Sequence, residues 1–73
     1  MDTWSIRNNI RKLRFQHDEM TQQQLADKVK VTRQTIVAIE KGKYTPSLEL
    51  AFRIARAFGV PLEAVFFVEE TQA

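Results

Sequence analysis

The chain has 73 residues, a net charge of +2 and no cysteine, which fits a single domain over residues 1–73 and excludes disulfide bridges and thiolate metal sites. Its longest apolar run, residues 64–68, is far shorter than the ~20 residues that span a membrane, and residues 1–9 lack the apolar core of a signal peptide, so we expect a cytoplasmic protein. Residues 1–43 carry nine Lys and Arg against five Asp and Glu, whereas residues 44–73 carry two against four, so the N-terminal half suits a polyanionic partner. On charge alone, an ordinary solvated surface explains this imbalance equally well.

The first predicted helix begins near Ser5 or Asn8 and ends at His17. Its apolar residues recur at intervals of four and three positions, which places them on one helical face: Ile6, Ile10 and Leu13. Its arginines form a second stripe beside that face: Arg7, Arg11 and Arg14. We therefore expect a helix with one apolar face and a stripe of arginines beside it.

Residues 21–42, TQQQLADKVKVTRQTIVAIEKG, are predicted to form two short helices joined by a tight turn. Thr21 and Gln24 have the spacing of a capping box, and Thr32 suits the N-cap of the second helix. The two predicted helices run from Gln22 to Lys28 and from Arg33 to Glu40 or Lys41. A short helix, a tight turn and a second helix with a polar first turn are typical of a helix-turn-helix.

Two further helices are predicted in the C-terminal half. The fourth helix starts at Pro46 or Ser47 and ends at Phe58, and the fifth spans residues 61–66. The sequence thus predicts an all-α fold of five helices around one core. The β-branched and aromatic run of residues 65–69 also fits a short strand.

The second helix of the motif has an outward face that suits the reading of DNA bases. Ile36 and Ile39 point inward, which exposes the opposite face: Arg33, Gln34, Val37, Ala38 and Lys41. Arginine can hold guanine through two hydrogen bonds, glutamine can do the same for adenine, and apolar side chains can pack against thymine methyl groups. The second helix of a helix-turn-helix lies in the major groove of DNA. An ordinary exposed helix face is the competing interpretation.

Other residues of the same region suit the phosphates of the DNA backbone. Gln22 and Thr32 stand at helix starts, where free N–H groups and the helix dipole favour anions. A plain N-cap is a strong alternative explanation of Thr32, and a cap residue can serve both roles. Lys41, Lys43 and Tyr44 follow the second helix and can reach phosphates, which fixes register without reading sequence. The predicted DNA-binding set is Gln22, Thr32, Arg33, Gln34, Thr35, Val37, Ala38, Lys41, Lys43 and Tyr44.

Residues 21–43, with IRKLR before them and YTPSLELAFRIARAFGVPLEAVF after them, resemble the lambda repressor/Cro-like helix-turn-helix family, also called the xenobiotic-response-element family. The resemblance covers about residues 8–67. It implies a compact five-helix domain that binds double-stranded DNA.

The resemblance also implies roles for single residues. Gln22 matches a glutamine that contacts phosphate, and the family's base contacts fall on Arg33, Gln34 and Ala38. Arg14 and Glu40 match an ion pair that ties the first helix to the end of the third, which we interpret as structural.

Two loops depart from the family pattern. The turn of the motif holds Lys30 where the family usually has glycine, and a left-handed backbone there would cost a lysine ~1 kcal/mol relative to glycine. The connection after the first helix holds Asp18 and Glu19 and also lacks the usual glycine. We expect local differences in these loops and an intact motif.

The C-terminal segment carries more apolar surface than one small core needs. Phe66 and Phe67 are consecutive, so they cannot both point inward in a helix or in a strand. We expect residues 65–70 to be the dimerisation segment of a two-fold symmetric homodimer. The predicted interface is formed by Trp4, Leu62, Phe66, Phe67 and Val68. Closure of the chain's own core under the first helix is the alternative use of some of these side chains.

Three functions fit these observations. The first is a transcriptional repressor that binds a palindromic operator as a homodimer, and the second is an antitoxin-like or partner-binding regulator whose apolar C-terminal surface engages a different protein. The third is an interaction module that bridges proteins without DNA. We expect no enzyme, metal, cofactor or small-molecule ligand, because the single histidine, His17, has no ligand-forming partners and there is no glycine-rich phosphate loop.

Overall fold

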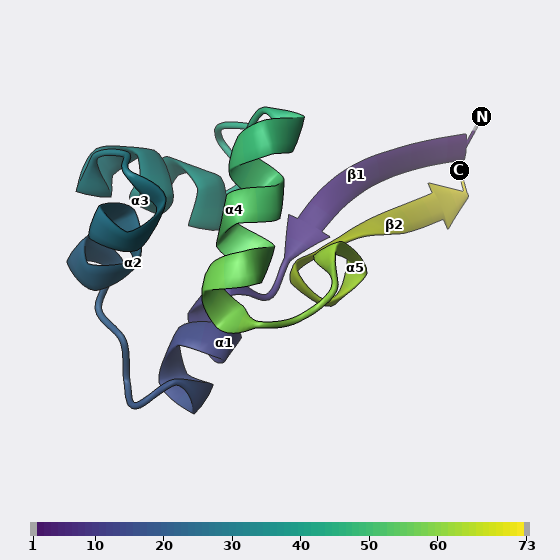
Figure 1. Ribbon diagram of the computed structural model, residues 1–73. Helices are drawn as coiled ribbons and strands as arrows, with labels where there is room; N and C mark the ends of the chain where they lie inside the picture. The colour runs from purple at the N-terminus through teal and green to yellow at the C-terminus, as the bar shows by residue number, and fades with distance from the viewer. Residues whose placement is uncertain (1, 73) are drawn as a thin grey trace.

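The computed structural model describes residues 2–72, which form five helices and a two-stranded antiparallel sheet (Figure 1). In chain order the elements are β1 (Asp2–Asn8), α1 (Ile10–Gln16), α2 (Gln22–Val29), α3 (Arg33–Glu40), α4 (Leu48–Phe58), α5 (Leu62–Val65) and β2 (Phe66–Gln72). The five predicted helices are confirmed with shifts at their ends, and the C-terminal strand is confirmed as β2. The all-α prediction is wrong in one respect, because the two ends of the chain pair as a sheet.

The first predicted helix starts later than expected, at Ile10 rather than at Ser5 or Asn8. The preceding residues form β1, which pairs with β2 so that Ile6 stands opposite Val68. Residues 4–7 alternate between apolar and polar with the strand period of two. The strand that pairs with them lies at the other end of the chain, so the local sequence does not show that they form a sheet. The four-residue spacing of Ile6 and Ile10 therefore does not mark a helix face, and Ile6 is exposed.

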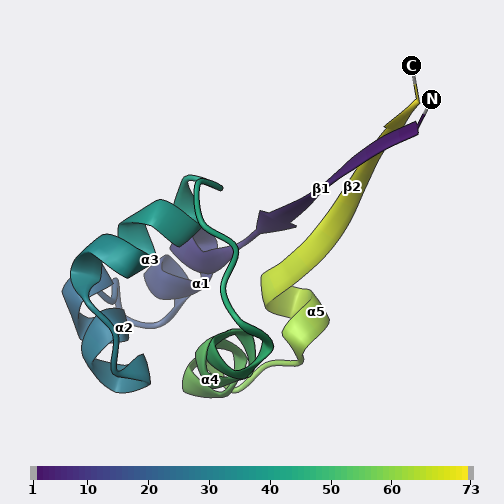
Figure 2. The ribbon, with the colours of Figure 1, turned by 90° about the horizontal axis from the view of Figure 1, so that it is seen from above.

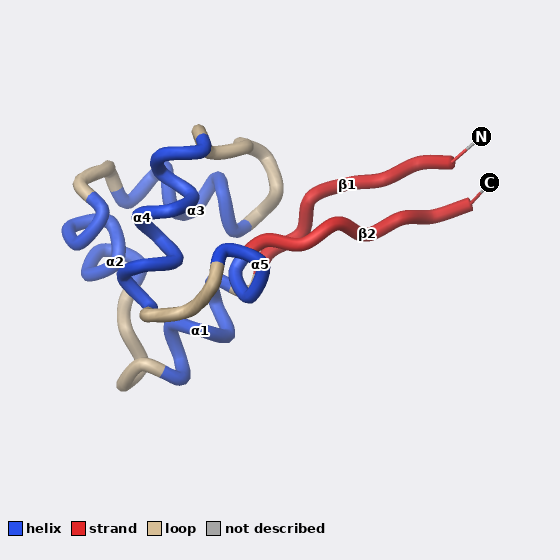
Figure 3. Tube along the Cα trace, turned by 45° about the vertical axis from the view of Figure 1, so that its right-hand side comes forward, coloured by secondary structure: helices blue, strands red, loops and turns tan. Residues whose placement is uncertain are grey.

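The helices enclose one apolar core. Each helix contributes a side chain with no exposed surface: Ile10, Leu25, Ile36, Ile54 and Val65. Burying an aliphatic side chain of this size stabilises the fold by about 1.5–3 kcal/mol. Figure 3 shows the helices gathered in one body from which the two strands extend.

The paired strands project from the helical body as an arm, which gives the molecule extents of 40 × 21 × 20 Å (Figures 1 and 2). Because residues opposite each other in an antiparallel pair point to the same side, one face of the arm carries Trp4, Ile6 and Val68. We call these three side chains the apolar face of the arm; they are 63%, 45% and 54% exposed, in that order. On the opposite face, Nη1 of Arg7 donates to Oε1 of Glu69 at 3.0 Å.

The predicted N-caps of the motif are confirmed. The hydroxyl of Thr21 accepts a hydrogen bond from the backbone N–H of Gln24 at 3.0 Å, and the side-chain oxygen of Gln24 accepts from the backbone N–H of Thr21 at 2.8 Å. The hydroxyl of Thr32 accepts from the backbone N–H of Thr35 at 3.2 Å. These caps fix where α2 and α3 begin, and each typically contributes about 1 kcal/mol.

Both loops that depart from the family pattern have a left-handed backbone. Lys30 ends α2 with φ 63°, and its N–H donates to the carbonyl of Ala26. Asp18 and Glu19 follow α1 with φ values of 57° and 55°. This conformation costs an L-residue roughly 1–2 kcal/mol relative to the right-handed one, so the missing glycines leave strain in both loops.

Candidate DNA-binding surface

One face of α3 is turned outward, away from the core (Figure 2). Ile36 and Ile39 are buried, as the helical pattern predicts. Arg33 and Gln34 are exposed in the first turn of α3, and Val37 and Ala38 on the same face are partly buried. A shallow groove of about 390 Å³ runs over this face, lined by Arg33, Gln34, Val37, Ala38, Lys41 and Lys43. The structure therefore brings six of the ten predicted DNA-binding residues together.

The other four predicted DNA-binding residues lie outside the shallow groove. Thr32 and Thr35 stand at the start of α3, with their hydroxyl oxygens 3.0 Å apart. Gln22 opens α2. Tyr44 is half-exposed in the loop after α3, outside the shallow groove. A single surface built on the two helices of the motif thus holds hydrogen-bonding, apolar and cationic groups.

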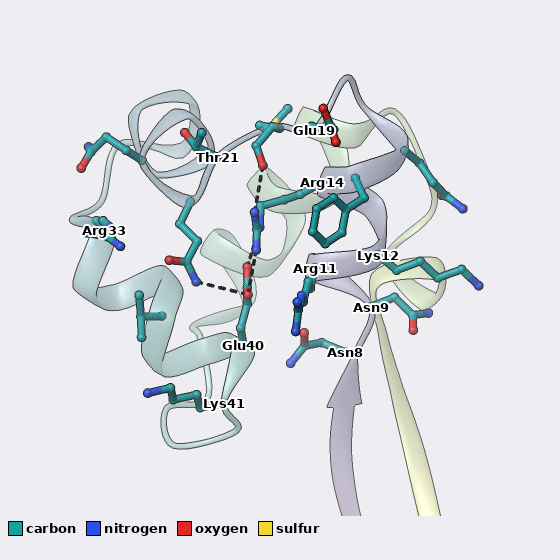
Figure 4. A pocket seen from close by; sticks show the side chains of 16 residues that line it. Asn8, Asn9, Arg11, Lys12, Arg14, Glu19, Thr21, Arg33, Glu40 and Lys41 are labelled. Atoms are coloured by element: carbon teal, nitrogen blue, oxygen red, sulfur yellow. Dashed lines mark hydrogen bonds and ion pairs between the residues drawn. The ribbon is translucent and has the colours of Figure 1, made fainter.

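A buried ion pair lies beside this surface (Figure 4). Nε of Arg14 donates to Oε2 of Glu40 at 2.8 Å, and Nη2 of Arg14 donates to Oε1 at 3.2 Å, so the pair is bidentate. Nη1 of Arg14 donates to the carbonyl of Met20 at 2.8 Å. The side chains of Arg14 and Glu40 are only 11% and 10% exposed. The pair joins α1, the loop after it and the end of α3.

Gln22 belongs to the same network. Its Nε2 donates to Oε1 of Glu40 at 3.3 Å, from the first turn of α2 to the last turn of α3. One amide hydrogen is used in this way and a second remains available. The orientation of the Gln22 amide is therefore coupled to the buried carboxylate of Glu40.

A second, larger groove of about 1340 Å³ separates α1 from α2 and α3 (Figure 4). It shares Arg33, Val37 and Lys41 with the shallow groove, so the two form a continuous surface. Its α1 wall includes Arg11 and Phe15, to which the sequence analysis gives no function. The predicted stripe of three arginines is wrong as a helix feature, because Arg7 lies on β1 and Arg14 is buried, which leaves Arg11 as its exposed member on α1. The position of Arg11 beside α3 follows only from the tertiary fold.

The residues predicted for a dimer interface lie in different surroundings. Leu62 and Phe66 pack against the core of their own chain, while Trp4 and Val68 belong to the apolar face of the arm. Phe67 is 39% exposed and stands opposite Arg7, on the other face of the arm. The consecutive phenylalanines thus do point to opposite sides, and Ile6 is an exposed apolar neighbour that the sequence analysis did not include.

His17 has a structural environment. Its Nδ1 lies 2.9 Å from the carbonyl oxygen of Leu13 and its Nε2 lies 3.0 Å from that of Phe58, whose ring it meets edge-on at 5.2 Å. The side chain therefore links the end of α1 to the end of α4. Among the side chains that the structure describes, residues 4–70, no group of His, Asp and Glu is placed to hold a metal ion. No helix within residues 2–72 is long and apolar enough to cross a membrane.

Comparison with known proteins places the chain among helix-turn-helix proteins. The sequence profile of the helix-turn-helix family matches residues 10–65. An uncharacterized HTH-type transcriptional regulator of Methanocaldococcus jannaschii is 51% identical over 67 residues, which are 92% of this chain and the whole of that protein. The uncharacterized HTH-type transcriptional regulator YgzD of Bacillus subtilis is 46% identical over 65 residues, or 89% of this chain and 97% of that protein. The cryptic phage CTXphi transcriptional repressor RstR of Vibrio cholerae is 34% identical over 64 residues, or 88% of this chain and 57% of that protein.

The chain therefore belongs to the lambda repressor/Cro-like helix-turn-helix family, as its motif predicts. Its class is that of helix-turn-helix transcriptional regulators. The motif of the class is built here from α2 and α3, with Lys30 at the turn between them.

Proposed function

We propose that this protein is a sequence-specific regulator, most simply a repressor, that binds double-stranded DNA as a homodimer on a palindromic operator. The observation that carries the proposal is the outward face of α3, where Arg33 and Gln34 are exposed next to two apolar side chains. RstR, the phage relative, is named as a transcriptional repressor. The relatives of this chain come from archaea and bacteria, whose DNA lies in the cytoplasm, so the protein would act there, in a prokaryotic cytosol and encoded by the cell or by a phage.

The chemistry of α3 supports base reading. With α3 in the major groove, the first-turn residues Arg33 and Gln34 come nearest to the base edges, where they suit guanine and adenine. Val37 and Ala38 follow on the same face and suit thymine methyl groups. Repression would follow when the bound protein covers promoter DNA.

The phosphate contacts would come from the borders of this face. Gln22 stands at the N-terminus of α2 and Thr32 at the N-terminus of α3. The free backbone N–H groups of a helix N-terminus favour anions. Lys41 and Lys43 add positive charge at the other end of α3. These contacts would fix the register of α3 on the duplex.

The exposed apolar face of the arm supports a homodimer. A lone two-stranded sheet is at best marginally stable in water, and the apolar face continues outward from Phe66, which packs on the core. Packing this face against the same face of a second copy gives an isologous, two-fold interface. Two copies of α3 would then reach half-sites about one helical turn apart, ~34 Å.

A titration with base variants of a bound duplex tests the base-reading role. The duplex is first selected from a random library, and then wild type, Arg33→Ala and Lys43→Ala are titrated against it and against its single-base variants. Arg33→Ala should lose ~1–3 kcal/mol of binding free energy and relax the preference at one base pair, whereas Lys43→Ala should weaken binding to all duplexes alike. Equal losses on every duplex from Arg33→Ala would refute the base-reading assignment.

The same apolar face also supports the alternative of a partner-binding, antitoxin-like regulator. In that case the arm would pack against a different protein while α3 binds DNA. Light scattering of the purified chain separates the two, because a stable dimer supports the homodimer and a clean monomer supports the alternative.

A further inference from the structure

The larger groove between α1 and α3 has the charge of a site for a polyanion. Five basic side chains and two acidic ones line it. Arg14 and Glu40 neutralise each other at its floor. The groove is left with an excess of cationic groups, among them Arg11 on one wall and Arg33 and Lys41 on the other.

Arg11 lies over an exposed aromatic ring. Its Cζ lies 5.6 Å from the ring centroid of Phe15, within the range of a cation–π interaction. The Cζ of Arg14 lies 5.8 Å from the same centroid, so the ring contacts two guanidinium groups. Phe15 is 52% exposed and contributes little to the core. Its position is better explained by these two arginines than by packing.

The larger groove is continuous with the outward face of α3, and this continuity indicates what binds in the groove. Arg33, Val37 and Lys41 line both grooves, so a duplex seated on α3 must run its backbone along one of the flanking walls. The major groove is about 12 Å wide, and a phosphate strand borders it on each side of an inserted helix. Figure 4 shows Arg11 on the side of α1 that faces α3 across the groove.

We propose that one phosphate strand of the bound DNA lies in the larger groove and that the guanidinium of Arg11, positioned by Phe15, contacts it. α1 is then a third DNA-contacting element beside the two helices of the motif. The contact adds affinity without reading sequence, because phosphates are the same at every base pair. This inference rests on the proposed function.

The test measures binding of a fluorescent duplex by anisotropy between 50 and 200 mM salt, for wild type, Arg11→Gln and Arg56→Gln. Arg56 is exposed on α4 and lines neither groove, so its variant is a control for the same loss of charge. Arg11→Gln should weaken binding about tenfold for each copy on the duplex, the usual effect of losing one charged hydrogen bond. It should do so equally on the selected duplex and on a random one, and its plot of log affinity against log salt should be shallower by about 0.9 per contact.

Two changes at Phe15 test its positioning role. Phe15→Leu removes the ring without changing charge, so binding should weaken by a few-fold while the salt slope stays near that of wild type. Phe15→Tyr keeps the ring and should bind with the affinity of wild type. Matching melting temperatures of the variants would show that these effects do not come from unfolding.

The outcomes separate this inference from the proposed function. If wild type binds and Arg33→Ala loses base preference, but Arg11→Gln behaves like Arg56→Gln, the contact of α1 is refuted and the proposed function stands. If wild type binds no duplex even at 50 mM salt, the proposed function fails and this inference fails with it.

Discussion

The ion pair of Arg14 and Glu40 shows how much a single buried contact can control in a domain of this size. It is bidentate and nearly closed to solvent, and it also engages the Met20 carbonyl and the Gln22 amide. Removing one partner leaves the other charge buried without compensation, which typically costs 3–5 kcal/mol. That is a large part of the 5–15 kcal/mol by which most domains are stable.

We predict that Arg14→Met and Glu40→Leu each lower the free energy of unfolding by about 3–5 kcal/mol, and that the double variant loses less than the two single losses together. Urea unfolding followed by circular dichroism measures all three. Arg14→Lys keeps the charge but not the two-pronged geometry, and it should fall between wild type and Arg14→Met. Single variants within 0.5 kcal/mol of wild type would show that the pair is not structural.

The strained backbone at Lys30 predicts that glycine stabilises the fold at this position, and a glycine placed elsewhere in α2 is the control. The left-handed backbone of Lys30, φ 63°, suits glycine. Lys30→Gly removes about 1 kcal/mol of strain from the folded state. The greater freedom of glycine stabilises the unfolded chain and offsets part of this gain, so the free energy of unfolding should rise by about 0.5 kcal/mol.

The matched change Lys28→Gly lies in an exposed turn of α2 with ordinary helical geometry, where it should lower the free energy of unfolding by about 1 kcal/mol. Thermal unfolding of the two variants under one set of conditions shows whether each change raises or lowers the free energy of unfolding. Destabilisation by both changes would mean that Lys30 is not strained.

At the scale of elements, the start of α3 combines a stabilising role with a proposed binding role in one residue. Thr32 caps the helix through its hydroxyl and lies where the proposed phosphate contact falls. Thr32→Ala should lower the free energy of unfolding by about 1 kcal/mol, whereas Thr32→Asp should keep the cap.

The same pair of variants separates the two roles of Thr32. Thr32→Asp should weaken DNA binding despite its intact stability, because it brings a negative charge to the phosphate. Anisotropy titration together with thermal unfolding gives both quantities. If Thr32→Asp binds DNA as well as wild type, Thr32 is a cap alone.

The elements also show why part of the fold could be predicted and part could not. α2 and α3 are specified by local signals, namely the threonine caps and the inward spacing of apolar residues, and these hold in the structure. β1 is stabilised by pairing with the opposite end of the chain, and the alternation in residues 4–7 was hidden by the apparent helical spacing of Ile6 and Ile10. The position of Arg11 beside α3 likewise depends on tertiary packing and not on any local pattern.

For the whole molecule, the arm is the feature that connects the fold to the proposed homodimer. Its apolar face supports the homodimer, and Phe67 stands on the opposite face next to Arg7. We predict that Val68→Lys converts a dimer into a monomer, while Phe67→Lys leaves the dimer intact. Light scattering after size exclusion measures both. Dissociation by Phe67→Lys alone would assign the interface to the other face of the arm.

Selection of bound sequences from a random duplex library tests the central claim most directly, that α3 reads bases within a two-fold dimer. Wild type should enrich two inverted copies of one short half-site with centres about one helical turn apart, ~34 Å. Arg33→Ala, selected in parallel, should lose the preference at one base pair in each half-site. No enriched sequence from folded wild-type protein, or the same enriched sequence from Arg33→Ala, would contradict the account.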